Sequence, residues 1–301
     1  MRIVIAGASG LIGTALTGLL AARGDEVVRL VRRPEAGPGE VSWDPAAGTL
    51  DPAALAGADA VVNLAGASLA QLPWTRSRRS GILRSRIAAT STIVRALREV
   101  GDASPALINA SAVGLYGDRP GEPLTETAGA GRGFLADVVR RWEAEALAAP
   151  PGTRVVLART GLVIGEGPAL RPLRLLAGLG LAGPLGSGRQ HWPWISLRDE
   201  ASALVHLIDH GVSGPVNLAG PTPATAGDVV RTLARSMSRP YWFPTPAPLL
   251  TLALGDAARE LLLSDQLEVP QVLRDTGFTF ADPTIADAVA RLGAREGPGG
   301  R

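Results

Sequence analysis

The sequence predicts an α/β fold, in which a doubly wound parallel sheet is followed by a smaller C-terminal α+β lobe. An apolar strand over residues 2–6 opens the chain and turns at glycines into a helix over 11–23. The chain becomes rich in glycine, proline and leucine around residues 168–188, and its 301 residues are enough for one large α/β domain or for a main domain with a smaller lobe. Further strands, several separated by helical segments such as 76–100, are expected at 26–31, 59–66, 106–110, 154–159 and 214–218.

The turn after the first strand carries three glycines at a spacing of three, Gly7, Gly10 and Gly13. Gly7 allows a tight turn, Gly10 lets the backbone approach a pyrophosphate at the helix N-terminus, and Gly13 allows close packing of helix on strand. The pattern predicts a dinucleotide site; the alternative is a glycine-rich turn in another kind of α/β protein. The cofactor-binding residues expected from it are Gly7, Ser9, Gly10, Leu11 and Ile12.

The end of the second strand indicates which dinucleotide the site prefers. A site for NAD(H) usually places an acidic residue here to bind the ribose 2′-hydroxyl, whereas arginine accommodates the 2′-phosphate of NADP(H). The strand ends in Arg32 and Arg33, and no acidic residue occurs before Glu35. We therefore expect Arg32 to bind the phosphate and the cofactor to be NADP(H) rather than NAD(H). The alternative is that both arginines are solvated loop residues.

The strand at 59–66 ends in small residues, at the edge of the sheet where ligands of such folds bind. Because these residues lack bulk, their backbone can lie against a flat ring. We therefore expect Leu64, Ala65 and Gly66 to contact the cofactor.

Composition excludes several kinds of site and partner. The 301 residues include no cysteine, which excludes disulfides, thiolate nucleophiles and cysteine-bound metals. All 30 basic residues are arginine, and the formal charge of only +2 gives no reason to expect a nucleic-acid partner. No apolar run approaches the roughly 20 residues of a membrane span, and no leader precedes the first strand. We therefore expect a cytoplasmic protein that binds no membrane and acts on a small molecule.

The three histidines give little sign of a metal site. His206 and His210 lie four residues apart on a predicted helix, but the segment lacks the glutamate of a zinc-protease motif and an evident third ligand. We therefore expect no metal. His191 lies beside Trp192 and Trp194, in a segment expected to cover the cofactor, so it is the histidine most worth testing.

Several sequence blocks occur in order along nearly the whole chain. They are GASGLIG, Trp43-Asp44, NLAG, Ser85-Arg86, SAVGLYG, Trp142-Glu143, RTGLVIG, GPLGSGRQ, PWI and residues 263–278. With these blocks the chain resembles an atypical extended short-chain dehydrogenase/reductase, of the group called epimerase family proteins and similar to NAD-dependent epimerases/dehydratases. The resemblance implies a Rossmann-type sheet that binds NADP(H) and a C-terminal domain of unknown function that closes over a substrate.

The resemblance also implies where the site residues lie. Ser111 matches the superfamily serine at the end of its strand. Tyr116 follows five residues later and is either a relocated acid or a residue that packs beside the nicotinamide or substrate. Val163 matches the segment that flanks the nicotinamide. Arg86 stands where extended relatives have an asparagine, and it either reaches cofactor phosphate or ribose or ties two helices together.

Conventional members of the superfamily use a Tyr-x-x-x-Lys pair on one helix, where the lysine lowers the pKa of the tyrosine that acts as acid and base. This chain contains no lysine, and its helical segment 134–143 has no tyrosine either. The arginines there, Arg140 and Arg141, stay protonated and do not shuttle protons. The usual mechanism therefore does not carry over.

These observations give two expectations for function. The first is an NADP(H)-dependent oxidoreductase or epimerase-like enzyme that acts by hydride transfer on a small, hydroxylated or sugar-like substrate around Ser111 and Tyr116. The second is a catalytically silent NADP(H)-binding sensor or regulatory module. We expect a dinucleotide-binding domain at 1–165, a substrate lobe at 166–293 from which some segments return to the first domain, and a flexible tail at 294–301. The oligomeric state is left open.

Overall fold

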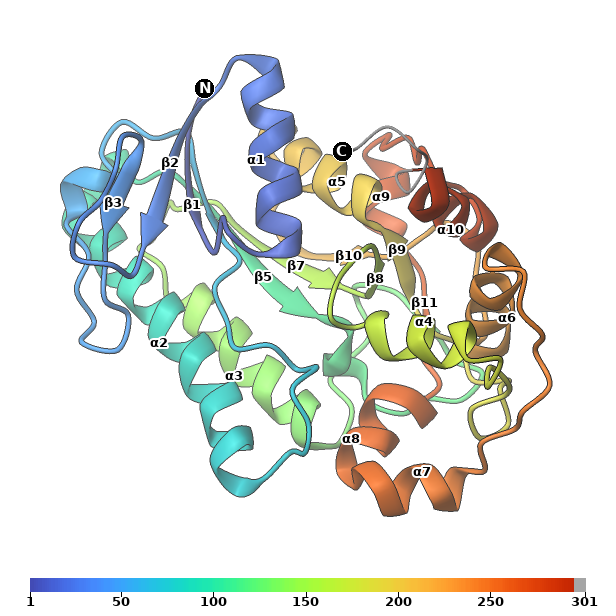
Figure 1. Cartoon of the computed structure of the whole chain (residues 1–301). Helices are drawn as coiled ribbons and strands as arrows, with labels where there is room; N and C mark the ends of the chain where they lie inside the picture. The colour runs from blue at the N-terminus through green and yellow to red at the C-terminus, as the bar shows by residue number, and fades with distance from the viewer. Residues whose placement is uncertain (295–301) are drawn as a thin grey trace.

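A seven-stranded parallel sheet forms the centre of the computed structural model, which describes residues 1–294 (Figure 1). The strand order is β10-β7-β5-β4-β1-β2-β3, and every neighbouring pair is parallel. The chain reverses its direction across the sheet at β1, and ligands of such sheets bind at this point, outside the carboxyl ends of the strands. The prediction of a Rossmann-type doubly wound sheet is confirmed. Its strands are β1 (Arg2–Ala6), β2 (Glu26–Val31), β3 (Glu40–Ser42), β4 (Ala60–Asn63), β5 (Ala106–Ala112), β7 (Val155–Thr160) and β10 (Gly214–Leu218).

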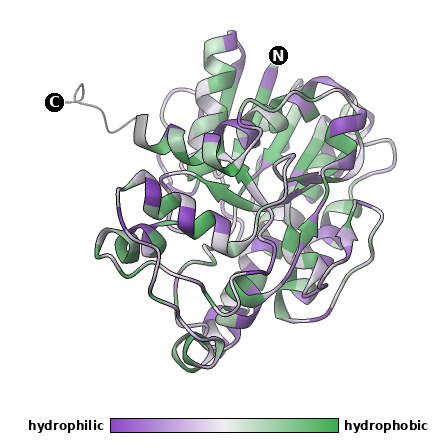
Figure 2. Cartoon of the chain, turned by 90° about the vertical axis from the view of Figure 1, so that its right-hand side faces the viewer, coloured by the Kyte–Doolittle hydropathy of each residue, from purple (hydrophilic) through white to green (hydrophobic). Residues whose placement is uncertain are grey.

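Helices cover both faces of this sheet. On one face Ile3 packs with Leu16 and Leu204, and on the other Val4 packs with Ile93, since neighbouring residues of a strand point to opposite faces. Both faces are therefore buried, which explains why the strands are apolar throughout. The apolar colouring of the sheet interior is visible in Figure 2. The first face carries α1 (Leu11–Arg23) and α5 (Leu197–Asp209), and the second carries α2 (Arg76–Val100) and α3 (Phe134–Leu147).

The smaller lobe lies beside the β10 edge of the sheet, on the right in Figure 1. It contains two short parallel pairs, β8 (Leu162–Ile164) with β9 (Trp194–Ser196) and β6 (Pro123–Leu124) with β11 (Leu267–Glu268). A separate apolar core holds its helices together. The helices of this core are α4 (Arg171–Gly178), α6 (Ala226–Ser236), α7 (Ala247–Leu254), α8 (Asp256–Ala258) and α10 (Ile285–Ala294), with the helical turn η4 (Arg259–Leu263). The helix α9 (Gln271–Asp275) packs instead in the core of the large sheet, through Leu273. Three further helical turns belong to the larger part of the molecule, η1 (Pro52–Ala54) and η2 (Gly101–Ala103) against α2 and η3 (Val113–Tyr116) against α3.

The structure refines the predicted division of the chain. The elements α5 and β10 lie beyond residue 165, yet they belong to the layers of the large sheet. Gly255 takes a φ of 59° and ends α7, so α7 and α8 are separate helices. The predicted tail begins at Ala294, the last residue of α10, and the rest of it lies outside the described residues.

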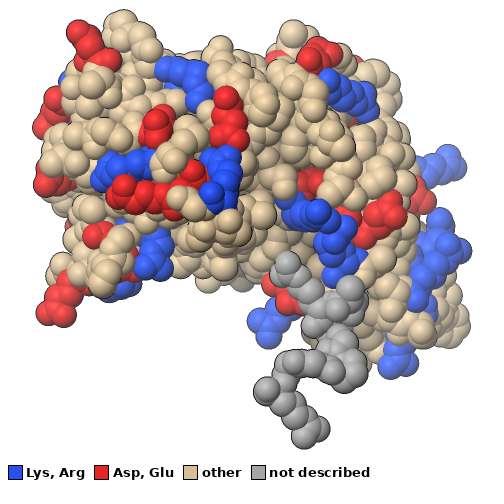
Figure 3. All heavy atoms as spheres, turned by 90° about the horizontal axis from the view of Figure 1, so that it is seen from above, with Lys and Arg blue, Asp and Glu red and all other residues tan. Residues whose placement is uncertain are grey.

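Charges of both signs are spread over the surface. Figure 3 shows arginine and acidic side chains interspersed on the face seen from above. Many form ion pairs, such as Arg23 with Asp25 and Asp209, both at 2.5 Å. Within residues 1–294, no helix has both the length and the apolar character needed to cross a membrane.

We expect Gly13→Ala to lower the free energy of unfolding by about 1–3 kcal/mol, because overpacking displaces the backbone. A Cβ at Gly13 would lie 2.3 Å from the carbonyl oxygen of Gly7 and 2.7 Å from the Cα of Ala8. Urea unfolding measures the change.

Gly18→Ala on the same helix is the matched control. Nothing lies within 4 Å of a Cβ at Gly18, so alanine there should stabilise the protein by about 0.5–1 kcal/mol. A Gly13→Ala protein as stable as the Gly18→Ala protein would show that the turn has room to move.

Candidate functional site

The glycine turn leaves the N-terminus of α1 open. Gly7 has a φ of 81°, and the N–H of Gly10 donates to its carbonyl oxygen at 3.0 Å. Gly10 then caps α1 without a side-chain hydrogen bond, and the first turn contains no acidic residue. A helix N-terminus of this kind attracts phosphate, because its N–H groups and the helix dipole face outward. Of the other predicted residues, Ser9 is exposed, and Leu11 and Ile12 are half-buried at the start of the helix.

The turn also lies against the end of β4. A Cβ on Gly7 would come within 2.8 Å of the carbonyl group of Leu64, so only glycine allows this approach. Asn63 holds the following loop, since its side-chain oxygen accepts from the N–H of Ala65 at 3.2 Å. The structure thus brings the predicted residues Leu64, Ala65 and Gly66 next to the glycine turn.

The two arginines at the end of β2 differ in their surroundings. Arg33 donates to the carbonyl oxygen of Glu35 and pairs with Glu40 on β3. Arg32 is exposed, and within the described part of the chain it makes neither a hydrogen bond nor an ion pair. Arg32 therefore keeps its donors free at the strand end where the sequence places the 2′-phosphate.

The segment after β8 packs over the start of α1. A Cβ on Gly167 would lie 2.5 Å from the side chain of Leu11, and one on Gly165 would lie 3.5 Å from it. Val163 packs against the same apolar cluster as Ile12. The predicted residue Val163, two positions before Gly165, therefore lies in the segment that packs on the start of α1.

Ser111 and Tyr116 belong to one buried polar network. The hydroxyl of Ser111 donates to Glu143 at 2.6 Å, and Glu143 accepts two further hydrogen bonds from Arg159, at 2.9 and 3.0 Å. Arg159 also donates to the hydroxyl of Tyr116 at 2.9 Å, and that hydroxyl donates to Asn217 at 2.6 Å. The network joins the carboxyl ends of β5, β7 and β10 to α3.

Burial favours the packing role for Tyr116 over that of an acid. The residue is fully buried, and its proton is engaged by Asn217. Burial raises the pKa of the Tyr116 hydroxyl above its ordinary value, although Arg159 opposes the shift. A hydroxyl so placed is a poor proton donor at neutral pH.

The helix α3 presents apolar side chains to η3. Leu135 contacts the position of Gly114, where a Cβ would lie 3.0 Å from its own. Val139, four residues later, packs with Leu115 and Tyr116. Leu135 and Val139 thus have the four-residue spacing of a Tyr-x-x-x-Lys pair, but neither side chain is titratable.

Two buried carboxyl groups lie outside this network. Glu200, on α5, accepts from the Thr160 hydroxyl at 2.9 Å, and burial raises its pKa to about 8. Glu268, on β11, has no hydrogen-bond partner for either oxygen within the described chain. Burial raises the pKa of Glu268 well above its usual range, and the carboxyl of Glu126 adds to the shift. Both groups are therefore expected to hold a proton at neutral pH.

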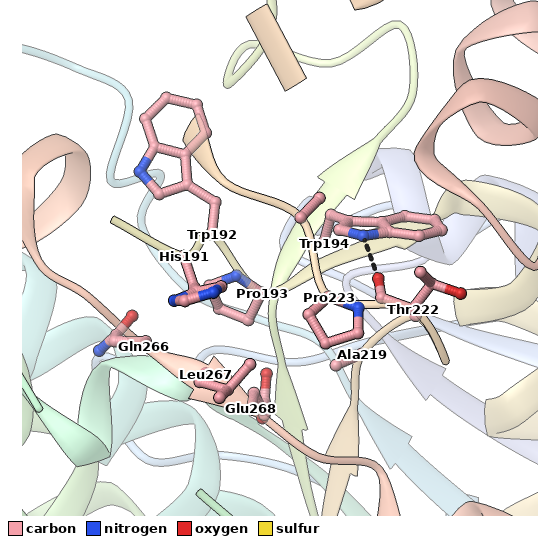
Figure 4. Close-up of a pocket in the computed structure, with 12 residues that line it drawn as sticks. His191, Trp192, Pro193, Trp194, Ala219, Thr222, Pro223, Gln266, Leu267 and Glu268 are labelled. Carbon is pink, nitrogen blue, oxygen red and sulfur yellow. Dashed lines mark hydrogen bonds between the residues drawn. The ribbon is translucent and has the colours of Figure 1, made fainter. Parts of the chain in front are cut away.

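Glu268 lines a small cavity between β11 and the segment that carries the tryptophans (Figure 4). His191 also lines it, and its Nδ1 lies 2.8 Å from a carboxyl oxygen of Asp265. The cavity holds about 10 Å³, which is room for about one water molecule. It is therefore too small for a cofactor, and nothing in its geometry gives His191 access to one.

The other histidines pack together. The rings of His206 and His210 stack with their centroids 4.0 Å apart, and His206 shares a hydrogen bond with Thr276 at 2.9 Å. Burial lowers the pKa of His206, and the neighbouring His210 adds to the shift. In the described chain no group of three or more His, Asp or Glu residues is arranged to hold a metal ion.

Comparison with known proteins supports the arrangement of the whole chain. The model of the NAD dependent epimerase/dehydratase family matches residues 3–219. The chain belongs to this family. A domain of unknown function (DUF1731) matches residues 245–292, which lie in the smaller lobe.

Relatives of this family cover nearly all of the chain. An epimerase family protein of Mycobacterium bovis is 43% identical over 298 residues, 98% of each chain. The epimerase family protein SDR39U1 of Homo sapiens is 32% identical, over 97% of this chain and 99% of its own. The crystal structure of the human protein with NADPH has a TM-score of 0.88, with 98% of this chain and 99% of that chain covered. A nucleoside-diphosphate sugar epimerase of Corynebacterium glutamicum has a TM-score of 0.80, at 32% identity, and 58% of that chain is covered.

We expect Glu143→Gln to lower the free energy of unfolding by about 3–5 kcal/mol, because it leaves the buried charge of Arg159 without a counter-charge. Urea unfolding measures the loss. Glu145→Gln, two residues along the same helix, changes a half-buried carboxylate that has no partner in the described chain, so it should shift stability by less than about 0.5 kcal/mol. Equal losses of stability in Glu143→Gln and Glu145→Gln would contradict a stabilising ion pair between Glu143 and Arg159.

Glu200→Gln should stabilise the protein at alkaline pH. The ordinary pKa of the carboxyl is 4.5 and its folded value is about 8, so wild-type stability falls as pH rises between these values and levels off above them. The glutamine keeps an acceptor for Thr160 and carries no charge. We expect the variant to be more stable at pH 8 by an amount on the order of a few kcal/mol, with the difference vanishing toward pH 4.5. Parallel stability profiles from urea unfolding across this range would contradict a raised pKa.

Proposed function

We propose that the protein binds NADP(H) at the glycine turn and uses it as an oxidoreductase or epimerase-like enzyme on a small, hydroxylated or sugar-like substrate. The observation that carries the proposal is the free guanidinium of Arg32 at the end of β2, beside a helix N-terminus that no side chain caps. The NADPH in the crystal structure of the human relative supports the same cofactor.

The described residues fit such a cofactor. The open N-terminus of α1 suits the diphosphate, Arg32 suits the 2′-phosphate, and the small residues after β4 leave room for a ring. Bound there, the nicotinamide would accept or supply a hydride. The residues proposed to hold the cofactor are Gly7, Ser9, Gly10, Leu11, Ile12, Arg32, Leu64, Ala65, Gly66 and Val163.

We assign Ser111 and Tyr116 to positioning. Glu143 fixes the Ser111 hydroxyl, and Asn217 fixes that of Tyr116, so both shape the end of the sheet that faces the substrate. In the proposed reaction the cofactor would supply or accept the hydride. Tyr116 is badly placed to transfer the proton that accompanies it.

A silent NADP(H) sensor is the second candidate, and the apolar face of α3 favours it. Incubation with NADPH and a panel of carbonyl compounds and nucleotide sugars separates the two. Oxidation of NADPH by any member of the panel supports the enzyme. Tight NADPH binding without turnover, together with a change in oligomeric state, supports the sensor.

The interspersed surface charges support a small-molecule substrate rather than a nucleic-acid or membrane partner, because no broad field of one sign occurs on the face in Figure 3. We further propose, from the composition alone, that the protein is cytoplasmic.

We expect Arg32→Ala to weaken NADPH binding by about ten- to hundredfold, which corresponds to the loss of a charge-assisted contact on the order of 1.5–3 kcal/mol. NADH lacks the 2′-phosphate, so its Kd should change by less than about twofold. Titration of cofactor fluorescence measures both constants.

Arg235→Ala is the control for loss of one positive charge. Arg235 is an exposed residue at the end of α6 in the smaller lobe, and its side chain makes no hydrogen bond or ion pair in the described chain. Both Kd values should stay unchanged in this variant. Equal losses of NADPH and NADH affinity in Arg32→Ala would refute the assignment of the 2′-phosphate to Arg32.

A further inference from the structure

One carboxyl group at the joint between the two lobes is buried without any hydrogen bond in the described chain. Glu268 lies on β11, and neither of its carboxyl oxygens has a partner. Figure 4 shows its side chain pointing from β11 into the small cavity that Pro193 and Pro223 also line. The cavity has room for about one water molecule, which is too little to hydrate an ionised carboxylate. Glu268 therefore fits this place only while it carries a proton.

The charged groups that face Glu268 leave a negative charge on it unpaired. Arg159 attracts such a charge, but its guanidinium already holds Glu143 through two hydrogen bonds. The carboxyl groups of Glu126 and Glu200 both disfavour it. Burial and the charge of Glu126 accordingly raise the pKa of Glu268 well above its usual range.

Two further titratable groups lie nearby, and both are engaged elsewhere. The hydroxyl of Tyr116 interacts with Glu268 but donates its proton to Asn217 at 2.6 Å. His191 lines the same cavity, and its Nδ1 lies 2.8 Å from a carboxyl oxygen of Asp265. Neither group forms a hydrogen bond with Glu268 in the described chain. The proton on Glu268 is therefore what keeps its charge from being buried.

A contact through Glu126 connects Glu268 with the polar network of the sheet. The Glu126 carboxyl accepts from the backbone N–H of Asn217 at 3.1 Å and from that of Val272 at 3.0 Å. The side chain of Asn217 in turn accepts the hydrogen bond from Tyr116. Repulsion between an ionised Glu268 and Glu126 therefore acts on the groups that hold Tyr116 in place.

We propose that Glu268 is a proton-operated switch at the joint between β11 and the tryptophan segment, residues 191–194. With its proton, Glu268 lets these two pieces of chain pack against each other. When the proton leaves for the solvent, the buried charge has no counter-charge, and water that enters the cavity relieves the cost. The joint then opens, and Glu126 loosens its hold on Asn217. This inference goes beyond the proposed function and does not depend on a cofactor.

The sign of the switch follows from the raised pKa of Glu268. The closed joint is fully stable at low and neutral pH and loses stability as the pH rises through the folded-state pKa. Few other groups titrate there, because the chain has no lysine and no cysteine, and its two tyrosines titrate at about pH 10 or above. The N-terminal amine also titrates in this range, but every variant below retains it.

Tryptophan emission and amide hydrogen exchange of the full chain, measured from about pH 6 to about pH 10, test the switch. Glu200→Gln serves as the background, since Glu200 ionises in the same range. In this background we expect the emission of the buried Trp192 and Trp194 to shift to the red as the pH rises. Exchange in residues 264–272, corrected for its intrinsic pH dependence, should become about tenfold faster or more.

Adding Glu268→Gln to this background keeps the size of the side chain and removes its charge, so both changes should disappear. Glu268→Leu should abolish them as well, and it decides the test if the glutamine variant does not fold. Glu145→Gln, which removes a half-buried carboxylate without a partner in the described chain, should leave them intact.

Two results would overturn the switch. One is the same alkaline transition with and without Glu268→Gln in the Glu200→Gln background. The other is the absence of any transition up to about pH 10 in that background. Because NADPH takes no part in these measurements, a protein that fails to bind it would refute the proposed function and leave this test unchanged.

Discussion

The ion pair between Glu143 and Arg159 is the constraint on which the site end of the sheet depends. Both side chains are buried, and the guanidinium meets the carboxylate through two hydrogen bonds of 2.9 and 3.0 Å. Hydrogen bonds with Glu143 raise the pKa of Arg159 against the opposing effect of burial. A buried pair of this kind tolerates little displacement, because moving one partner leaves the other charge unpaired. It therefore fixes α3 against the carboxyl ends of β5 and β7.

A different constraint shapes the cofactor end. Gly7 and Gly13 bring strand, turn and helix closer than any side chain allows. The N–H of Gly10 donates to the carbonyl oxygen of Gly7 within the turn, but no side chain caps the N-terminus of α1. At the α3 end of the site the polar side chains thus satisfy one another, whereas the N-terminus of α1 stays open to a ligand.

Much of this was predictable from local patterns. The helices Leu11–Arg23 and Arg76–Val100 and the strand Glu26–Val31 have the predicted bounds, because glycines and apolar periodicity mark them in sequence. The network around Glu143 and Arg159 was not identified, although both residues lie in blocks of the family resemblance. Their pairing depends on the packing of a helix against a strand, and spacing along the chain does not show it. The break at Gly255 was visible as a glycine within a helical pattern, but only its left-handed φ of 59° decides that α7 ends there.

The chemistry of the proposed site is limited by the basic residue that the chain uses. The chain contains arginine but no lysine. Because the charge of arginine persists at any working pH, these residues bind anions but do not exchange protons. The buried Tyr116 hydroxyl donates its proton in a hydrogen bond to Asn217, and Glu200 and Glu268 are also buried away from solvent. Under the proposed function, the proton that accompanies a hydride therefore passes through water or through the substrate itself.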